Sequence, residues 1–340
     1  MKLTRVVVVT VVYGNRLPFL KKVVDSVIED PKITHIIIVD NNCTGIPQLK
    51  ENYSGDLSDK ITILHQEKNI GYSGAIHAAL QTAKQIDCDH VFILDDDSVP
   101  EKGAVDRFID NLTLIGDPKT ILAANRIDVP GNKNIFKKRP LSNTRPTMTI
   151  FKVFTLGKIY HAYKFIFKIK DRVDYPFIPI VPVESVVTGG SFIPISAIRE
   201  TPLPDKNFFI YGEDLEFSWN MYKKGYRMYV CAQPIIRDID MTFNEEGGHI
   251  SGLFAEETPD FKVYFRIRNS VIISKRHSSQ PKTILLLSVV TWMVALFMYC
   301  LCIHGPSKHF IKRSRLIILA TQNGFKENFQ IPDTIDIPGR

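Results

Sequence analysis

The chain has 340 residues, of which 44% are hydrophobic and 23% are charged, and its formal net charge is +7. These values exclude a disordered chain and fit one large domain, with or without a smaller appendage. The basic balance suits anionic partners, but neither zinc-finger spacing nor an RNA-binding signature accompanies it, so we expect no nucleic acid as a partner. The five cysteines fit neither a disulfide framework nor a zinc site, and we expect free thiols.

The first hundred residues alternate between two hydrophobic patterns. Apolar runs typical of strands occur at residues 6–13, 35–39, 61–65 and 90–94. Helical spacing of apolar residues occurs at 17–29 and 74–85. Short strands that alternate with helices predict an α/β fold, in which helices flank a mostly parallel central sheet. Ligands of such sheets bind beyond the carboxyl ends of the strands, so we expect Asp40 and the triplet Asp95-Asp96-Asp97 to face one crevice.

The pattern changes after residue 130. Gly, Pro, Asn and Lys dominate the beginning of the stretch from 130 to 180 and prolines punctuate its end, which predicts a long mobile insertion. Beyond it, we expect a strand at 183–195, interrupted by Gly189-Gly190, a helix at 214–224 and a strand at 227–231.

The last eighty residues are basic and apolar. Patterns typical of basic helices occur at 261–276 and 308–325, and the 21 residues 283–303 between them carry no formal charge. We expect residues 328–340 to form a loose end. We therefore divide the chain into an α/β domain at 1–260 and a helical appendage at 261–340.

The triplet Asp95-Asp96-Asp97 follows a buried strand and concentrates negative charge. Adjacent carboxylates repel one another, which raises the pKa of some of them, and a divalent cation such as Mg²⁺ or Mn²⁺ removes that repulsion. Alternate residues of an extended segment point the same way, so we expect Asp95 and Asp97 to be the metal ligands and Asp96 to face a nucleotide ribose or a neighbouring donor. The competing interpretation is a solvated acidic turn.

Glu213 and Asp214 stand at the amino end of the predicted helix 214–224. Carboxylates are favoured there by the helix dipole, so they could simply cap the helix. They could also act as a general base that takes a proton from a hydroxyl group. Upstream, Gly189 and Gly190 allow a ligand to approach the backbone closely, or mark an ordinary bulge.

Seven short motifs occur in order along residues 5–275, at 8–16, 38–42, 69–75, 94–98, 188–192, 209–214 and 264–269. Together they resemble a family-2 glycosyltransferase of the GT-A fold, closest to the rhamnosyltransferase- and galactofuranosyltransferase-like branch. The resemblance implies an inverting enzyme in which Asp214, beside Glu213, is the catalytic base and Asp95 and Asp97 bind Mn²⁺ or Mg²⁺. It implies nucleotide and donor contacts from Thr10, Val12, Tyr13, Arg16, Asp40, Asn69, Gly71, Gly74, Asp96, Gly189 and Gly190.

One position departs from the branch's pattern. The branch has a His as a further metal ligand about two dozen residues after the catalytic Asp, and Asp238 occupies that place here. A carboxylate also ligates Mg²⁺ or Mn²⁺, so we expect Asp238 as the third ligand, with Asp240 and His249 as alternatives.

The resemblance implies sugar transfer from UDP-galactofuranose, dTDP-rhamnose or a UDP-hexose to a glycan or lipid-linked acceptor during cell-surface polysaccharide synthesis. Two alternatives stay open. Residues 13–18 loosely resemble the phosphate loop of sugar nucleotidyltransferases, although Gly14 is their only glycine. The replaced His also leaves room for a catalytically silent scaffold on the membrane.

Residues 283–303 are long enough to cross a bilayer. Spanning would place the basic tail outside the cell, against the positive-inside tendency. We therefore expect a peripheral or monotopic arrangement at the cytoplasmic face of the cell membrane, with basic flanks on anionic head groups. A buried core helix is the competing interpretation, and the sequence leaves the oligomeric state open.

Overall fold

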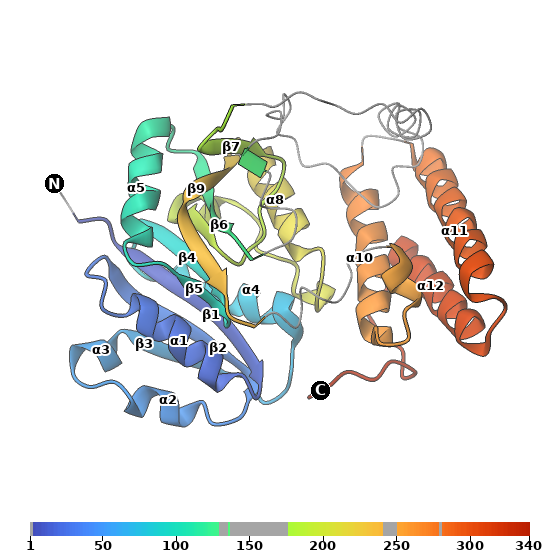
Figure 1. Ribbon diagram of the computed structural model, residues 1–340, viewed down its shortest axis with the longest axis horizontal. Helices are drawn as coiled ribbons and strands as arrows, with labels where there is room; N and C mark the ends of the chain where they lie inside the picture. Colours follow the sequence, from blue (N-terminus) through green and yellow to red (C-terminus); the bar gives the residue numbers. More distant parts are fainter. Residues whose placement is uncertain (1–2, 129–134, 137–175, 241–249, 279–280) are drawn as a thin grey trace.

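The computed structural model describes residues 3–128, 135–136, 176–240, 250–278 and 281–340 (Figure 1). Most of the predicted insertion at 130–180 and the alternative metal ligand His249 lie outside the described residues.

A nine-stranded sheet forms the centre of the α/β domain, in the order β3-β2-β1-β4-β8-β6-β9-β5, with β7 paired to β9. The strands are β1 (Val6–Gly14), β2 (Ile33–Cys43), β3 (Ile61–His65), β4 (His90–Asp95), β5 (Ser98–Pro100), β6 (Thr120–Arg126), β7 (Ile180–Val183), β8 (Ser191–Pro194) and β9 (Arg227–Asp238). The first four strands in this order are parallel, as predicted. The other half is mixed, because β8 runs antiparallel to β4 and β6, whereas β6 and β9 are parallel.

Helices cover both faces of the sheet, and β1 shows why. Successive side chains of a strand point to opposite faces, so Val7 and Val9 join one hydrophobic cluster, with α4 (Gly71–Ala83) and α8 (Glu213–Lys223). Val6 and Val8 join a second cluster, with α1 (Leu17–Val27) and α5 (Ala104–Ile115). A strand buried on both faces is a continuous apolar run, which is the pattern that predicts it. The smaller elements are α2 (Pro47–Glu51), α3 (Asp56–Asp59), α7 (Ile195–Glu200), η2 (Lys206–Phe208) and η3 (Ile250–Phe254).

The helical appendage consists of α10 (Asp260–His277), α11 (Lys282–His304) and α12 (Lys308–Lys326), close to the predicted bounds (Figure 1). The three helices share one hydrophobic cluster. Within the described part of the chain, α11 is the one helix that is long and apolar enough to cross a membrane. About 33% of its most apolar stretch is buried.

Two predicted segments differ from the structure. The predicted strand at 183–195 is a strand only in its second half, because β7 ends at Val183, residues 184–190 form bends and a turn at Gly189-Gly190, and β8 begins at Ser191. The predicted loose end at 328–340 is docked, because the side chains of Ile335 and Ile337 are buried in the cluster of the appendage. Elements α5, β5 and β6 lie in a stretch for which the sequence patterns gave no prediction.

Candidate active site

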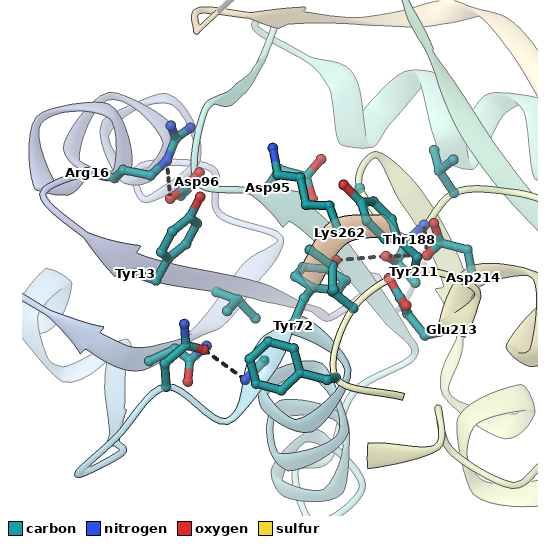
Figure 2. A pocket seen from close by; sticks show the side chains of 18 of the residues that line it. Tyr13, Arg16, Tyr72, Asp95, Asp96, Thr188, Tyr211, Glu213, Asp214 and Lys262 are labelled. Atoms are coloured by element: carbon teal, nitrogen blue, oxygen red, sulfur yellow. Dashed lines mark hydrogen bonds and ion pairs between the residues drawn. The ribbon is translucent and has the colours of Figure 1, made fainter. Parts of the chain in front are cut away.

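A cavity of about 390 Å³ lies at the carboxyl ends of β1 and β4, between the sheet and the beginning of α10 (Figure 2). Ten of the predicted site residues line it: Tyr13, Arg16, Asn69, Gly71, Asp95, Asp96, Asp97, Gly189, Glu213 and Asp214. Figure 2 shows Asp96 and Glu213-Asp214 on opposite sides, with Lys262 reaching in between them. The fold therefore brings the acidic triplet and the Glu-Asp pair to one cavity, although 115 residues separate them in the chain.

The other predicted residues lie behind the lining. Thr10 and Val12 are buried in the sheet, and Gly74 packs against Ile70 inside α4. Gly190 bonds through its backbone to β4 and β6, since its N–H donates to the Ile93 carbonyl and its carbonyl accepts from Ala124.

Asp40 is buried at the end of β2, beside the lining residue Asn41. Its carboxylate accepts a hydrogen bond from the Cys43 N–H at 2.7 Å and lies 2.7 Å from the His65 ring. Asp40 thus holds the last residues of β2 instead of lining the cavity.

The side chain of Arg16 neutralises part of the negative charge of the acidic triplet. Its Nε donates to Asp96 at 2.8 Å, and its Nη2 donates to Asp97 at 2.8 Å. Its Nη1 donates to Asp240 at 2.5 Å. Burial nevertheless raises the pKa of Asp96 to about 7 and that of Asp97 to about 6, because desolvation disfavours their charged forms.

The expected alternation within the triplet was wrong. Strand β4 ends at Asp95, and the chain turns at Asp96 and Asp97. Side chains of a turn do not follow the two-residue period of a strand, so Asp96 and Asp97 both reach Arg16, while Asp95 faces another arginine.

That second arginine is Arg126, at the end of β6. Its Nη1 donates to Asp95 at 2.9 Å, and its Nη2 donates to Asp238 at 2.9 Å. Asp238 also accepts from Ser98 at 2.9 Å. One guanidinium thus joins the carboxylates at the ends of β4 and β9.

The carboxylates suit a divalent cation by their chemistry, because hard oxygen ligands bind Mg²⁺ and Mn²⁺. Arg126 already acts as a stand-in cation between Asp95 and Asp238, and a Cβ at Gly189 would collide with the Asp95 carboxylate. Two of the three predicted ligands therefore pair with one cation, Arg126, whereas the carboxylate of Asp97 pairs with Arg16. In the described ranges, no three acidic, His or Cys side chains form a group that could hold a metal.

Glu213 and Asp214 begin α8, where Glu213 is buried and Asp214 is half-buried. Asp214 Oδ1 accepts two hydrogen bonds from Thr188, at 3.0 Å from its backbone N–H and at 2.7 Å from its hydroxyl. Tyr72 shares a hydrogen bond of 2.7 Å with the same hydroxyl. Glu213 accepts from Ser73 at 3.2 Å.

Desolvation dominates the titration of this pair. Burial, and then the charge of Asp214, raises the pKa of Glu213 to about 8. Burial also raises the pKa of Asp214 above its ordinary value, against the opposing hydrogen bonds from Thr188. A carboxylate with a raised pKa holds an abstracted proton more firmly, which suits a general base.

The loop before α8 has an unusual backbone. Phe209 and Tyr211 have positive φ angles of 66° and 69°, a region that costs energy for residues other than glycine. The Asn269 carboxamide on α10 holds the loop by donating to the carbonyls of Phe208, Ile210 and Tyr211 at 2.9, 2.9 and 2.7 Å. The appendage therefore fixes the segment that positions Glu213 and Asp214.

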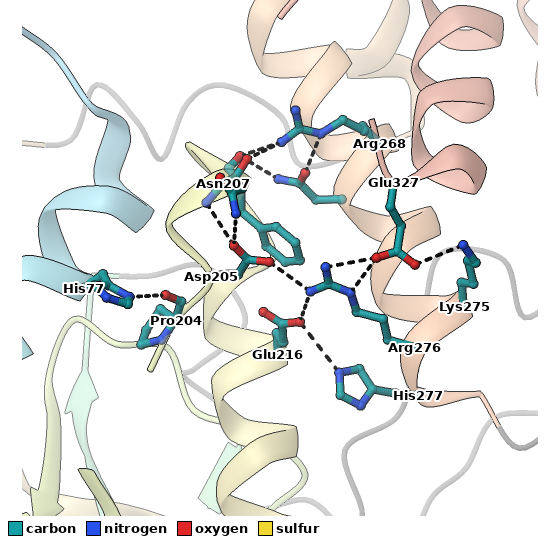
Figure 3. Close-up of polar contacts among 12 residues, drawn as sticks. His77, Pro204, Asp205, Asn207, Glu216, Arg268, Lys275, Arg276, His277 and Glu327 are labelled. Atoms are coloured by element: carbon teal, nitrogen blue, oxygen red, sulfur yellow. Dashed lines mark hydrogen bonds and ion pairs between the residues drawn. The ribbon is translucent and has the colours of Figure 1, made fainter. Parts of the chain in front are cut away.

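Further contacts join the same helix to the α/β domain (Figure 3). Arg268 donates to the Asn207 carbonyl at 2.8 Å. Arg276 pairs with Asp205 at 2.9 Å and with Glu216 at 2.7 Å. The motif at 264–269 had no role assigned from the sequence. It contains Arg268 and Asn269, which hold the loop before α8 by hydrogen bonds.

Several lining residues were not predicted as site residues: Asn41, Tyr72, Arg126, Thr188, Tyr211, Phe261, Lys262, Ile337 and Pro338. Asn41 and Thr188 belong to motifs noted in the sequence, so their position was a usable signal. No sequence motif singled out Arg126 or Lys262, and only the folded chain brings them to the cavity.

Comparison with known proteins identifies the family and the fold of the chain. The model of glycosyl transferase family 2 matches residues 7–177, which is half of the chain, and the chain therefore belongs to this family. No curated protein matches it. Its fold is that of the GT-A glycosyltransferases.

Three solved structures illustrate the likeness in fold. GalNAc-T7 with UDP, GalNAc and Mn²⁺ has a TM-score of 0.54 and 12% identity over 96% of this chain. The chain spans 57% of the length of that protein. The mannosyltransferase PcManGT from Pyrobaculum calidifontis, with GDP-Man and Mn²⁺, has a TM-score of 0.52 and 12% identity over 95% of this chain and 88% of its own. TarS 1–349 from S. aureus, with UDP-GlcNAc, has a TM-score of 0.50 and 13% identity over 95% and 81%.

Proposed function

We propose that this chain is an inverting glycosyltransferase that moves a sugar from a nucleoside-diphosphate sugar to a hydroxyl of a glycan or lipid-linked acceptor. The observation that carries the proposal is the single cavity that holds the acidic triplet on one side and the half-buried Asp214 on the other. Solved structures of the same fold contain UDP, UDP-GlcNAc or GDP-Man, which supports a nucleotide-sugar donor.

In the reaction we propose, Asp214 takes the proton of the acceptor hydroxyl. The hydroxyl oxygen forms a bond to the anomeric carbon, and the bond from that carbon to the diphosphate oxygen breaks with its electron pair. Attack opposite to the leaving group inverts the anomeric configuration. Thr188 fixes Asp214 through two hydrogen bonds to Oδ1, so Oδ2 is the oxygen assigned to receive the proton.

The cationic side chains of Arg16, Arg126 and Lys262 line the same cavity and suit an anionic diphosphate. We propose that Asp95 and Asp238, with Asp97 beside them, hold Mn²⁺ or Mg²⁺ in exchange for Arg126. A divalent cation there would neutralise charge on the departing diphosphate. Two of the similar structures contain Mn²⁺, which supports this choice.

The test is an assay of the purified full chain with UDP-galactofuranose, dTDP-rhamnose and UDP-hexoses in the presence of Mn²⁺ or Mg²⁺. We expect release of nucleoside diphosphate from one of these donors. Release of pyrophosphate from a nucleoside triphosphate and a sugar phosphate would instead support the nucleotidyltransferase alternative. Tight binding of a nucleoside diphosphate without any turnover would support the silent scaffold.

We also propose that the appendage rests on the cytoplasmic face of the cell membrane, where a lipid-linked acceptor of surface polysaccharide synthesis would be available. Helix α11 carries a set of exposed large apolar side chains: Ile284, Leu286, Leu287, Val290, Val294, Met298, Tyr299 and Leu301. Basic residues of α12, including Lys312 and Arg315, suit anionic head groups.

The membrane proposal is tested by flotation with vesicles that contain anionic lipid. Leu287→Glu combined with Met298→Glu should abolish flotation, because both side chains are more than half exposed on α11. Leu114→Glu is the matched control, since this leucine is 77% exposed on α5 of the α/β domain. Equal flotation of all three proteins would contradict the proposal.

A further inference from the structure

The last residues of the chain cross from the helical appendage to the cavity. Ile335 and Ile337 are both 7% exposed and pack in the hydrophobic cluster of the appendage. Ile337 and Pro338 also line the cavity, on the same lining as Asn41 and Asn69. Figure 1 shows the C-terminus below α10, on the side that faces the sheet. The segment Ile337–Gly339, which we call the C-terminal strap, is therefore shared by both parts of the molecule.

Hydrogen bonds attach the strap to the α/β domain. The backbone N–H of Asn69 donates to the Gly339 carbonyl at 2.9 Å, and its side-chain amide donates to the Pro338 carbonyl at 3.0 Å. The side chain of Asn42 donates to the Gly339 carbonyl at 3.1 Å. The strap thus binds the segment before α4 and the end of β2 together.

These bonds fix the orientation of one carboxamide. Because the Asn69 amide group points to the strap, its Oδ1 is left to accept from Asn41 at 2.9 Å and from the Gly71 N–H at 2.8 Å. Asn41 and Asn69 lie at the carboxyl ends of parallel strands, where nucleotides bind in such sheets. The orientation of polar groups in this part of the cavity therefore depends on the strap.

We propose that the C-terminal strap forms one wall of the subsite for the nucleotide base, with Ile337 and Pro338 as its apolar surface and Asn69 as the group that it positions. The inference rests on the proposed function, since it assumes a nucleoside-diphosphate donor. It makes donor affinity dependent on the docking of the appendage, which holds the strap through Ile335 and Ile337. The strap binds and orients but takes no part in proton transfer, so its loss raises KM for the donor and leaves kcat nearly unchanged.

The test compares nucleotide binding by the full chain and by the variant Ile335→Ser with Ile337→Ser, which removes the apolar anchors of the strap. The probe is whichever of UDP, dTDP and GDP binds the unaltered chain most tightly by titration calorimetry in the presence of Mn²⁺. We expect its Kd to rise about tenfold, as for the net loss of one or two hydrogen bonds. We expect the KM for the donor to rise by the same factor.

A second variant keeps the test informative if the double variant folds poorly. Gly339 has a φ of +74°, and a Cβ there would lie 3.4 Å from the Asn42 amide, so Gly339→Ala should disturb the strap without exposing an apolar anchor. Gly116→Ala is the matched control, because Gly116 has a φ of +69° with open space around it and lies at the end of α5. Gly339→Ala should weaken nucleotide binding a few-fold, and Gly116→Ala should not.

The outcomes separate the two proposals. If the unaltered chain binds none of the three nucleoside diphosphates, the proposed function fails. If it binds one of them and the folded strap variants bind it equally well or more tightly, the strap is not a wall of the subsite and the inference is overturned.

Discussion

The parallel half of the sheet and the helical appendage meet at one cavity but contribute to it in different ways. Strands β1, β2 and β4 present Tyr13, Asn41 and Asp95 at their carboxyl ends, so each residue follows a buried apolar run. The appendage contributes through Asn269 and the C-terminal strap, which contact residues far away in the chain. Under the proposed function, the sheet would supply the phosphate side of the site, and the appendage would orient the catalytic base Asp214 and the nucleotide subsite. Treatments and substitutions that disable the sheet side and the appendage side in turn should separate these two contributions.

On the sheet side, the largest effect is expected from removal of the divalent cation. Treatment with a chelator should lower glycosyl transfer about 100-fold or more, because a cation contributes several kcal/mol of charge stabilisation to the departing diphosphate. Transfer should return on addition of Mn²⁺ or Mg²⁺, as measured by release of nucleoside diphosphate. Undiminished transfer after exhaustive chelation would show that Arg16 and Arg126 are enough to stabilise the charge of the departing diphosphate.

The next largest effect is expected on the appendage side, from Asn269→Ala. This change leaves three loop carbonyls without the donor that they share, and the Asn269 side chain is fully buried. We expect a loss of about 2–4 kcal/mol in the free energy of unfolding and a fall of about tenfold in kcat, because the loop positions Asp214.

The control for that variant is Ser270→Ala, since this neighbouring hydroxyl bonds only within α10, to the Arg266 carbonyl at 2.6 Å. Denaturant unfolding and single-turnover kinetics would be measured for both proteins. If Asn269→Ala lowered stability without changing kcat, the appendage would stabilise the fold but would not position the catalytic base Asp214.

A smaller effect is expected from Arg126→Gln. The substitution removes the positive charge between Asp95 and Asp238, so Mn²⁺ should bind about tenfold more tightly. Arg107→Gln is the control, because Arg107 bonds to the Lys102 carbonyl on the surface of α5. Calorimetric titration with Mn²⁺ distinguishes them, and weaker binding by Arg126→Gln would place the metal away from this guanidinium.

The smallest effect concerns pH. The pKa of Asp96 is raised to about 7 and that of Asp97 to about 6, so these groups favour the folded state most when protonated. Their contribution to stability is present at low pH and is lost as the pH rises through 6 and 7. The metal-free protein should therefore lose a few degrees in Tm between pH 5 and pH 8. Asp96→Asn should flatten this slope, and an unchanged slope would contradict the assignment.

The comparison of the two regions also shows what the sequence could predict. The ends of β1, β2 and β4 were predictable because a buried strand leaves a local signature and parallel strands end at the same edge. The alternation within Asp95–Asp97 was not, because it depends on where β4 ends. Arg126 reaches Asp238 across 112 residues, and the strap reaches Asn69 across about 270, so no local period records either contact.

The central claim is that Asp214 is the base in a cavity completed by both regions, and Asp214→Asn tests it most directly. The change keeps the shape of the side chain, and Thr188 can still donate its hydroxyl to the amide oxygen. Asp110→Asn, at an exposed carboxylate of α5, is the control. We predict a fall in kcat of about 1,000-fold with unchanged nucleoside-diphosphate affinity and Tm. Full transfer activity in a folded Asp214→Asn protein would contradict the claim.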